Sequence, residues 1–150
     1  MPKLRTHALF SYVVLSISLL VPTLARAELP DDGQLDCTSN PHAFISSLIE
    51  QNWIEPQPTH VEANSVNAFR PKRGSHLHAF GFPIYMVFGY ARDDALFRQG
   101  KGKTIDAPVY GVVVHAPAES VRARLAQANS HAIVHPVVPL LLTAIACNGS

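Results

Sequence analysis

Two cysteines near opposite ends of an exported chain constrain this fold more than any other feature. They are Cys37 and Cys147, and the 150 residues contain no other cysteine. An exported chain meets an oxidising compartment, where a pair of cysteines usually forms a disulfide. We therefore expect a disulfide that ties the first ordered element to the last strand. With both thiols engaged, neither can act as a nucleophile.

Export is indicated by residues 1–27, which have the composition of a secretory signal peptide. A basic start is followed by an apolar run over residues 8–21, and residues 25–27 form the small-x-small cleavage site Ala-Arg-Ala. Pro22 and several serines interrupt the run, which argues against a membrane-spanning helix. We expect a periplasmic or secreted product that begins at Glu28 and has no membrane anchor.

The length and charge of the mature chain limit its partners. Removing 27 residues leaves 123, the size of one domain. The signal peptide contains three of the 12 basic residues and none of the 11 acidic ones, so the mature net charge is about −2. A nucleic-acid-binding domain normally carries a strongly basic face. We therefore expect no nucleic-acid partner, and no cofactor motif is present in the sequence.

The first part of the mature chain predicts a lead-in and a helix. Residues 28–39 are polar and contain Pro30 and Gly33, which is typical of a flexible segment. Asn40 and Pro41 are residue types that cap and open a helix. Four apolar residues then recur on one helical face: Phe44, Ile45, Leu48 and Ile49.

Aromatic and β-branched residues predict strands in the middle of the chain. The expected ranges are 64–70, 76–82, 84–90 and 109–115. Pro83 lies between the second range and the third, where it marks a bend, an edge or a break because proline cannot donate to a β-ladder. The run of valines in the fourth range is typical of a buried strand.

A second helix and a final apolar segment complete the pattern. The helix starts at Pro117, and its expected inner face consists of Val121, Leu125 and Ala128. One or two short strands then end at Cys147. The order of elements predicts one α+β domain over residues 40–150, with a mostly antiparallel sheet and two helices packed on one face.

The segment between Arg92 and Lys103 is the candidate binding surface. It is the longest mixed-charge connection, and it contains two glycines and an aromatic residue. Interfaces favour an aromatic or arginine anchor surrounded by polar groups. A second interpretation places Phe97 in the core of an ordinary charged hairpin, and the sequence leaves both open. The residues expected to contact a partner are Arg92, Asp93, Asp94, Phe97, Arg98 and Lys101.

A signal peptide, one small α+β domain, an end-to-end disulfide and no catalytic motif form the plan of many small periplasmic binding proteins. These include inhibitors and immunity proteins that block the cleft of an enzyme, an analogy of architecture and not of motif. We expect an exported protein-binding module that neutralises or regulates a partner enzyme, such as a cell-wall hydrolase or a secreted toxin.

Two alternatives remain open, a small secreted hydrolase with a histidine-dependent site and a histidine-based metal binder. His76 and His78 would share a face of a strand, so both could reach one metal ion. A third ligand would come from His115, His131 or His135. No carboxylate lies nearby in the sequence to orient the pair. We therefore assign no metal ligand and no catalytic residue.

Overall fold

The computed structural model describes residues 35–149. The expected signal peptide, its cleavage site and the first part of the lead-in lie outside this range. Neither described helix is long and apolar enough to cross a membrane. In chain order the elements are α1 (Pro41–Glu50), β1 (His60–Val61), β2 (Asn67–Phe69), β3 (His78–Ala79), β4 (Phe82–Tyr90), β5 (Val109–His115), α2 (Ala118–Gln127), β6 (Ile133–Val138) and β7 (Leu142–Asn148).

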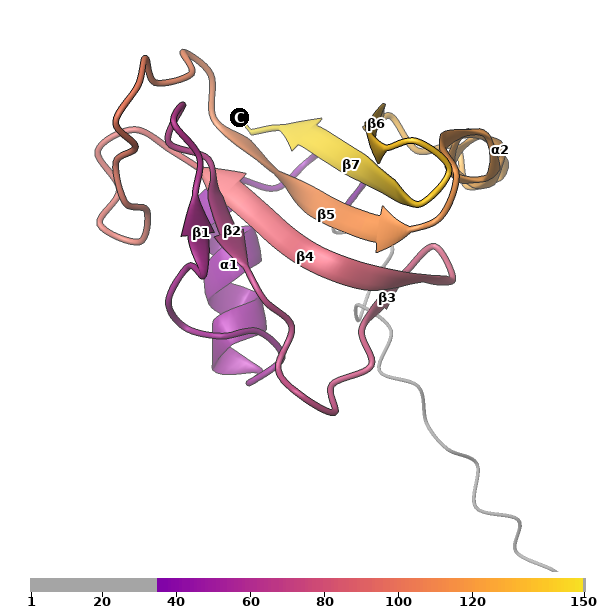
Figure 1. Cartoon of the computed structure of the whole chain (residues 1–150), viewed down its shortest axis with the longest axis horizontal. Coiled ribbons are helices and arrows are strands. Elements are labelled where there is room, and N and C mark those ends of the chain that lie inside the picture. Colours follow the sequence, from indigo (N-terminus) through magenta and orange to yellow (C-terminus); the bar gives the residue numbers. More distant parts are fainter. Residues whose placement is uncertain (1–34, 150) are drawn as a thin grey trace, which may run out of the picture.

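The strands form one antiparallel sheet in the order β1-β2-β4-β5-β7-β6, and β3 pairs with the start of β4. In Figure 1, α1 lies behind β1 and β2, and α2 lies beside β6. The predicted α+β fold, with a mostly antiparallel sheet and two helices, is confirmed.

The helix α1 forms where the sequence predicted it. The side chain of Asn40 accepts a hydrogen bond from the backbone N–H of Ala43 at 2.9 Å, which satisfies one of the free donors of the first turn. Pro41 occupies the first helical position, and Asn52 has a positive φ of 61° just beyond the last turn. Phe44 and Leu48 are among the residues that α1 buries against the sheet.

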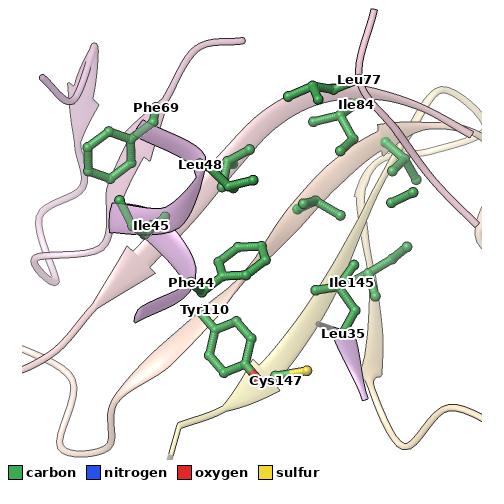
Figure 2. Packing of buried hydrophobic residues seen from close by; sticks show 14 of the residues in the cluster. Leu35, Phe44, Ile45, Leu48, Phe69, Leu77, Ile84, Tyr110, Ile145 and Cys147 are labelled. Carbon is green, nitrogen blue, oxygen red and sulfur yellow. The ribbon is translucent and has the colours of Figure 1, made fainter. Parts of the chain in front are cut away.

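The core lies between the helices and one face of the sheet. Tyr110, Val112 and Val114 alternate along β5 and are fully buried on this covered face, as is Ile145 of β7. The ring centroids of Phe44 and Tyr110 are 5.0 Å apart, so α1 packs directly on β5. Figure 2 shows Phe44, Tyr110 and Ile145 close together in this core.

The Cys37–Cys147 disulfide is formed, and it joins residues 110 positions apart. It holds the end of the lead-in against β7, so residues 35–39, which the sequence placed in a flexible segment, are attached to the domain. Leu35 is completely buried beside the disulfide, and its carbonyl accepts a hydrogen bond from Ser130 at 3.1 Å. The N–H of Ser39 also donates to the hydroxyl of Tyr110 at 3.1 Å, so burial, a cross-link and hydrogen bonds together attach this polar stretch to the domain.

Pro83 does not separate two strands. β4 starts at Phe82 and runs through Pro83, because neither neighbouring strand requires an N–H from the proline. The ladder with β5 begins only at Ile84, and on the β3 side, where Pro83 pairs with His78, the N–H of Ile84 donates to the oxygen of Leu77. The preceding turn contains Phe80 and Gly81, both with positive φ, at 52° and 82°. Positive φ at both central residues is the requirement of a tight type I′ hairpin turn. The strand predicted at 76–82 is therefore only the two residues of β3.

The other predicted elements differ from the structure in small ways. The strand expected at 64–70 is the shorter β2, and its partner β1 was not predicted. Pro117 is the N-cap of α2 and the helix starts one residue later. Val121 and Leu125 are buried as expected, whereas Ala128 is exposed at the C-cap, where the helix turns away from the sheet.

Candidate functional site

The connection between β4 and β5 is held tightly against the β1–β2 hairpin. Asn67 exchanges two hydrogen bonds of 2.9 Å with the backbone of Arg98, one from its amide and one to its carbonyl oxygen. The N–H of Gly100 donates to the hydroxyl of Ser65 at 2.9 Å. Asn67 and Ser65 are both completely buried. The connection contains no helix or strand, yet its backbone is fixed by buried polar side chains.

Phe97 belongs to the core. Its residue is 8% exposed, and its ring centroid lies 6.3 Å from that of Tyr90. The ring also fills the space next to Gly89, where an added Cβ would come within 3.2 Å of it. The interpretation of Phe97 as part of the core is the one that the structure bears out. A partner cannot use this ring as an anchor, because it already packs inside the domain.

Four of the other predicted contact residues are exposed on the connection. Arg92 lies 3.9 Å from Asp106, and both side chains are largely exposed, so their ion pair contributes little stability. The guanidinium of Arg98 contacts the side-chain oxygen of Gln57. Asp93 and Lys101 are exposed as well. These charges point outward from a fixed backbone and remain accessible to a partner.

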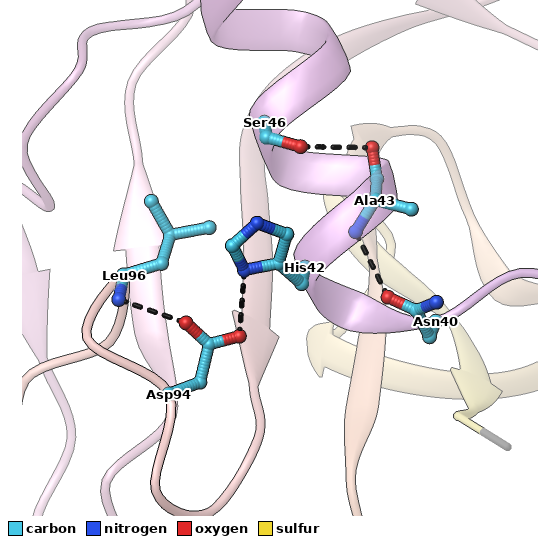
Figure 3. Close-up of polar contacts among 6 residues, drawn as sticks. All are labelled: Asn40, His42, Ala43, Ser46, Asp94 and Leu96. Carbon is cyan, nitrogen blue, oxygen red and sulfur yellow. Dashed lines mark hydrogen bonds and ion pairs between the residues drawn. The ribbon is translucent and has the colours of Figure 1, made fainter.

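Asp94 differs from its neighbours because it orients a histidine. Its Oδ2 lies 2.8 Å from Nδ1 of His42 in the first turn of α1, and its Oδ1 accepts a hydrogen bond from Leu96 at 2.9 Å (Figure 3). The carboxylate side chain is 17% exposed and the imidazole 59% exposed. A carboxylate that fixes an imidazole through one nitrogen is an arrangement found in acid–base sites. The two residues are 52 positions apart, so no local pattern in the sequence predicts this pair.

A pocket of about 360 Å³ lies where the connection meets α1. His42, Arg92, Asp94 and Asp106 are among the residues that line it. Tyr90 also lines it, and its buried hydroxyl has no hydrogen-bond partner among the described residues. A buried hydroxyl without a partner is costly. The two predicted residues Arg92 and Asp94 therefore meet in a pocket that the sequence did not predict.

The histidines proposed as metal ligands do not form a site. His76 lies outside β3, with a positive φ of 46°, so it does not share a strand face with His78. Nδ1 of His78 lies 2.6 Å from the backbone oxygen of His76. The ring of His115 packs against that of Tyr85, with 5.3 Å between the ring centroids. Within residues 35–149, no three His, Cys, Asp or Glu side chains are placed to hold a metal ion.

A second surface of interest is the face of the sheet opposite the helices, which we call the open face. Met86 pairs with Val113, and Val113 pairs with Ala144, so these residues lie side by side on it. They line a groove of about 600 Å³ that Val137 of β6 bounds as well. The run of valines suggested a strand buried on both faces, but only alternate valines of β5 are fully buried.

The turn between β6 and β7 follows the groove residue Val137 closely and contains exposed apolar residues. Leu140 is 76% exposed and Leu141 is 64% exposed.

Comparison of the chain with protein-family models, curated proteins and solved structures found no match.

Proposed function

We propose that this chain is an exported protein-binding module of the inhibitor or immunity type, which neutralises or regulates a partner enzyme such as a cell-wall hydrolase or a secreted toxin. The observation that carries the proposal is the connection between β4 and β5, which combines a fixed backbone with exposed charges of both signs. The two hydrogen bonds between Asn67 and the backbone of Arg98 fix the middle of this connection.

Preorganisation is the physical reason why such a segment suits binding. A loop that is already ordered loses little conformational entropy on association. The exposed side chains of Arg92, Asp93, Arg98 and Lys101 can then form charged contacts without a change in the backbone. Such contacts mainly raise the association rate and select the partner.

The test is capture of a partner from periplasmic or culture extract by the mature protein, followed by binding kinetics with the purified partner. The triple variant Arg92→Ala/Arg98→Ala/Lys101→Ala should bind at least tenfold more weakly, chiefly through slower association, and its binding should depend less on salt. The matched control removes three exposed arginines elsewhere, Arg70, Arg73 and Arg122. Equal affinity of the two triple variants would contradict the proposal.

A second candidate function is a histidine-dependent hydrolase, which the His42–Asp94 pair favours. The nearby hydroxyl of Ser46 donates to the backbone oxygen of Ala43 at 3.4 Å within α1, so the imidazole would activate a water molecule instead of this serine. The test is hydrolysis of ester, peptide and cell-wall glycan substrates by wild type, by His42→Gln and by the control His131→Gln. Activity that only His42→Gln abolishes would support this candidate.

A further inference from the structure

The open face differs from the rest of the surface in carrying no formal charge on its main strands. β4, β5, β6 and β7 contain no Asp, Glu, Lys or Arg. The same holds for every residue between Arg124 and Gly149. The carboxylate at the rim of the groove, Glu62, is 58% exposed and lies 3.2 Å from Nε2 of His60. A partner on this face therefore meets an apolar, uncharged floor.

The edge of the sheet is a poor alternative route to association. The sheet has two terminal strands: β1 has only two residues, and β6 contains Pro136, which pairs with Thr143 of β7. Because proline has no N–H, it fits in an edge strand only where its nitrogen faces away from the neighbouring strand. The free edge thus lacks a donor near its centre, which is a recognised protection against strand addition. We therefore expect association to occur through the open face and not by strand addition at the edge.

The open face contains a groove, and an exposed apolar turn follows one of the groove residues in the chain. The groove floor consists of small and apolar residues, with Ala68 on β2 and Phe88 over Gly111 of β5. An added Cβ at Gly111 would come within 2.8 Å of the Phe88 ring, so the absence of a side chain there lets the ring lie close to the sheet. Just beyond Val137, the turn projects Leu140 and Leu141 into solvent. One molecule therefore has both an apolar groove and an exposed apolar turn.

We propose that the open face is a dimer interface between two copies of this chain, in which Leu140 and Leu141 of each copy insert into the groove of the other. A two-fold interface uses the same patch on both copies, so a patch with its own groove and projection suits it. The proposal is independent of the enzyme partner inferred above, because the groove and the leucine turn share no residue with the charged contact residues of the connection.

Charge decides between a second copy and a different occupant. A charged protein surface would have to give up its hydration on this floor without gaining an opposite charge, which is unfavourable. An anionic lipid surface would likewise find no lysine or arginine on these strands. The open face of a second copy presents the same uncharged side chains and incurs neither cost.

The test is sedimentation equilibrium of the mature, disulfide-intact protein from about 1 to about 100 μM, a range in which dimers of moderate affinity dissociate. Wild type should form dimers, and its dissociation constant should not increase with added salt. Leu140→Glu on the turn and Ala68→Lys in the groove should each weaken the dimer at least tenfold. Ala126→Glu, at an exposed position of α2, is the matched control and should leave it unchanged.

A mixture of the Leu140→Glu and Ala68→Lys proteins sharpens the test. Each mixed dimer retains one unaltered contact and places the introduced carboxylate opposite the introduced ammonium group in the other. The mixture should therefore dimerise more tightly than either variant alone. A wild type that stays monomeric throughout the range, or that binds neutral lipid vesicles as a monomer, would overturn the proposal, as would a dimer that both variants leave intact.

Discussion

The two faces of the sheet carry similar side chains in different surroundings. On β5, Val112 and Val114 are completely buried beneath the helices, whereas Val113 between them lies on the open face and is only partly buried. The residue types do not distinguish these positions; the elements packed above them do. The covered face accordingly serves stability, and substitutions on the open face should affect association more than folding.

The disulfide provides the largest expected effect. Cys147→Ser should lower the free energy of unfolding by about 4 kcal/mol, because a cross-link over this separation restrains most of the unfolded chain. Urea unfolding followed by circular dichroism measures the change. The control is Ala146→Ser, the neighbouring residue on the open face, which should cost less than about 1 kcal/mol. Equal losses for both variants would contradict the distinction between the faces.

A pair of aromatic truncations compares the two faces directly. Phe44→Ala removes a ring that is 1% exposed and should cost about 3–5 kcal/mol, since it leaves a cavity on the covered face. Tyr85→Ala removes a ring from the open face that is 48% exposed and should cost about 1 kcal/mol or less. Thermal and urea unfolding of the monomer give both values. A loss for Tyr85→Ala as large as that for Phe44→Ala would show that the open face belongs to the core.

The rigidity of the connection depends on a smaller polar contribution. Asn67→Ala breaks both hydrogen bonds to Arg98 and a third to the carbonyl of Ser65, leaving buried groups unpaired. We expect a loss of about 2 kcal/mol. The variant should also increase the rate of hydrogen exchange, measured by mass spectrometry, more in residues 98–105 than in β5. Asn148→Ala, at an exposed site, is the control. Unchanged exchange in the connection would remove the argument from preorganisation.

The smallest effect concerns Tyr110. Burial raises the pKa of its phenol above the usual value near 10, a hydrogen bond from the N–H of Ser39 opposes this, and the charge of Asp36 raises the pKa further. A raised pKa means that the folded state holds the proton more tightly. The stabilisation is therefore complete below about pH 10 and is lost as the pH rises through the raised pKa.

The measurement is the stability of Tyr110→Phe as a function of pH. At pH 7 the variant should be about 1 kcal/mol less stable than wild type, because Ser39 loses its partner. Above pH 10 this difference should shrink, since only wild type has a phenol to ionise at this position. Tyr85→Phe on the open face is the control and should lie within about 0.5 kcal/mol of wild type at pH 7. A constant difference across the pH range would contradict the assignment.

Local patterns in the sequence predicted much of the fold. The cap at Asn40, the bounds of β5 and the pairing of the cysteines depend on neighbouring residues or on the absence of any other partner. Pro83 was expected to mark a bend, an edge or a break, and it does not interrupt β4, because whether a strand needs a given N–H depends on where its neighbour begins. The sequence left open whether Phe97 is exposed or belongs to the core for a similar reason, since its burial depends on the turn that starts at Asp94.

The candidate site was less predictable than the fold. Arg92 and Asp94 were identified from composition, but their neighbour His42 comes from a distant helix, and only tertiary packing brings it near. Two helices on one face of the sheet were expected, which leaves the other face uncovered, but the sequence did not predict the groove on that face. The groove combines residues from strands that are distant in the sequence, so no local pattern specifies it.

The solvent exposure of the three consecutive valines of β5 tests most directly whether one face of the sheet is open and forms an interface. Methyl NMR of Val112, Val113 and Val114 in the presence of a soluble nitroxide reports exposure on each face. At low protein concentration, the nitroxide should broaden the methyl signals of Val113 and leave those of its two neighbours sharp. As the concentration rises and dimers form, the signals of Val113 should sharpen. Broadening of Val113 that persists unchanged at every concentration would contradict an interface on the open face, and equal protection of all three valines would contradict the open face itself.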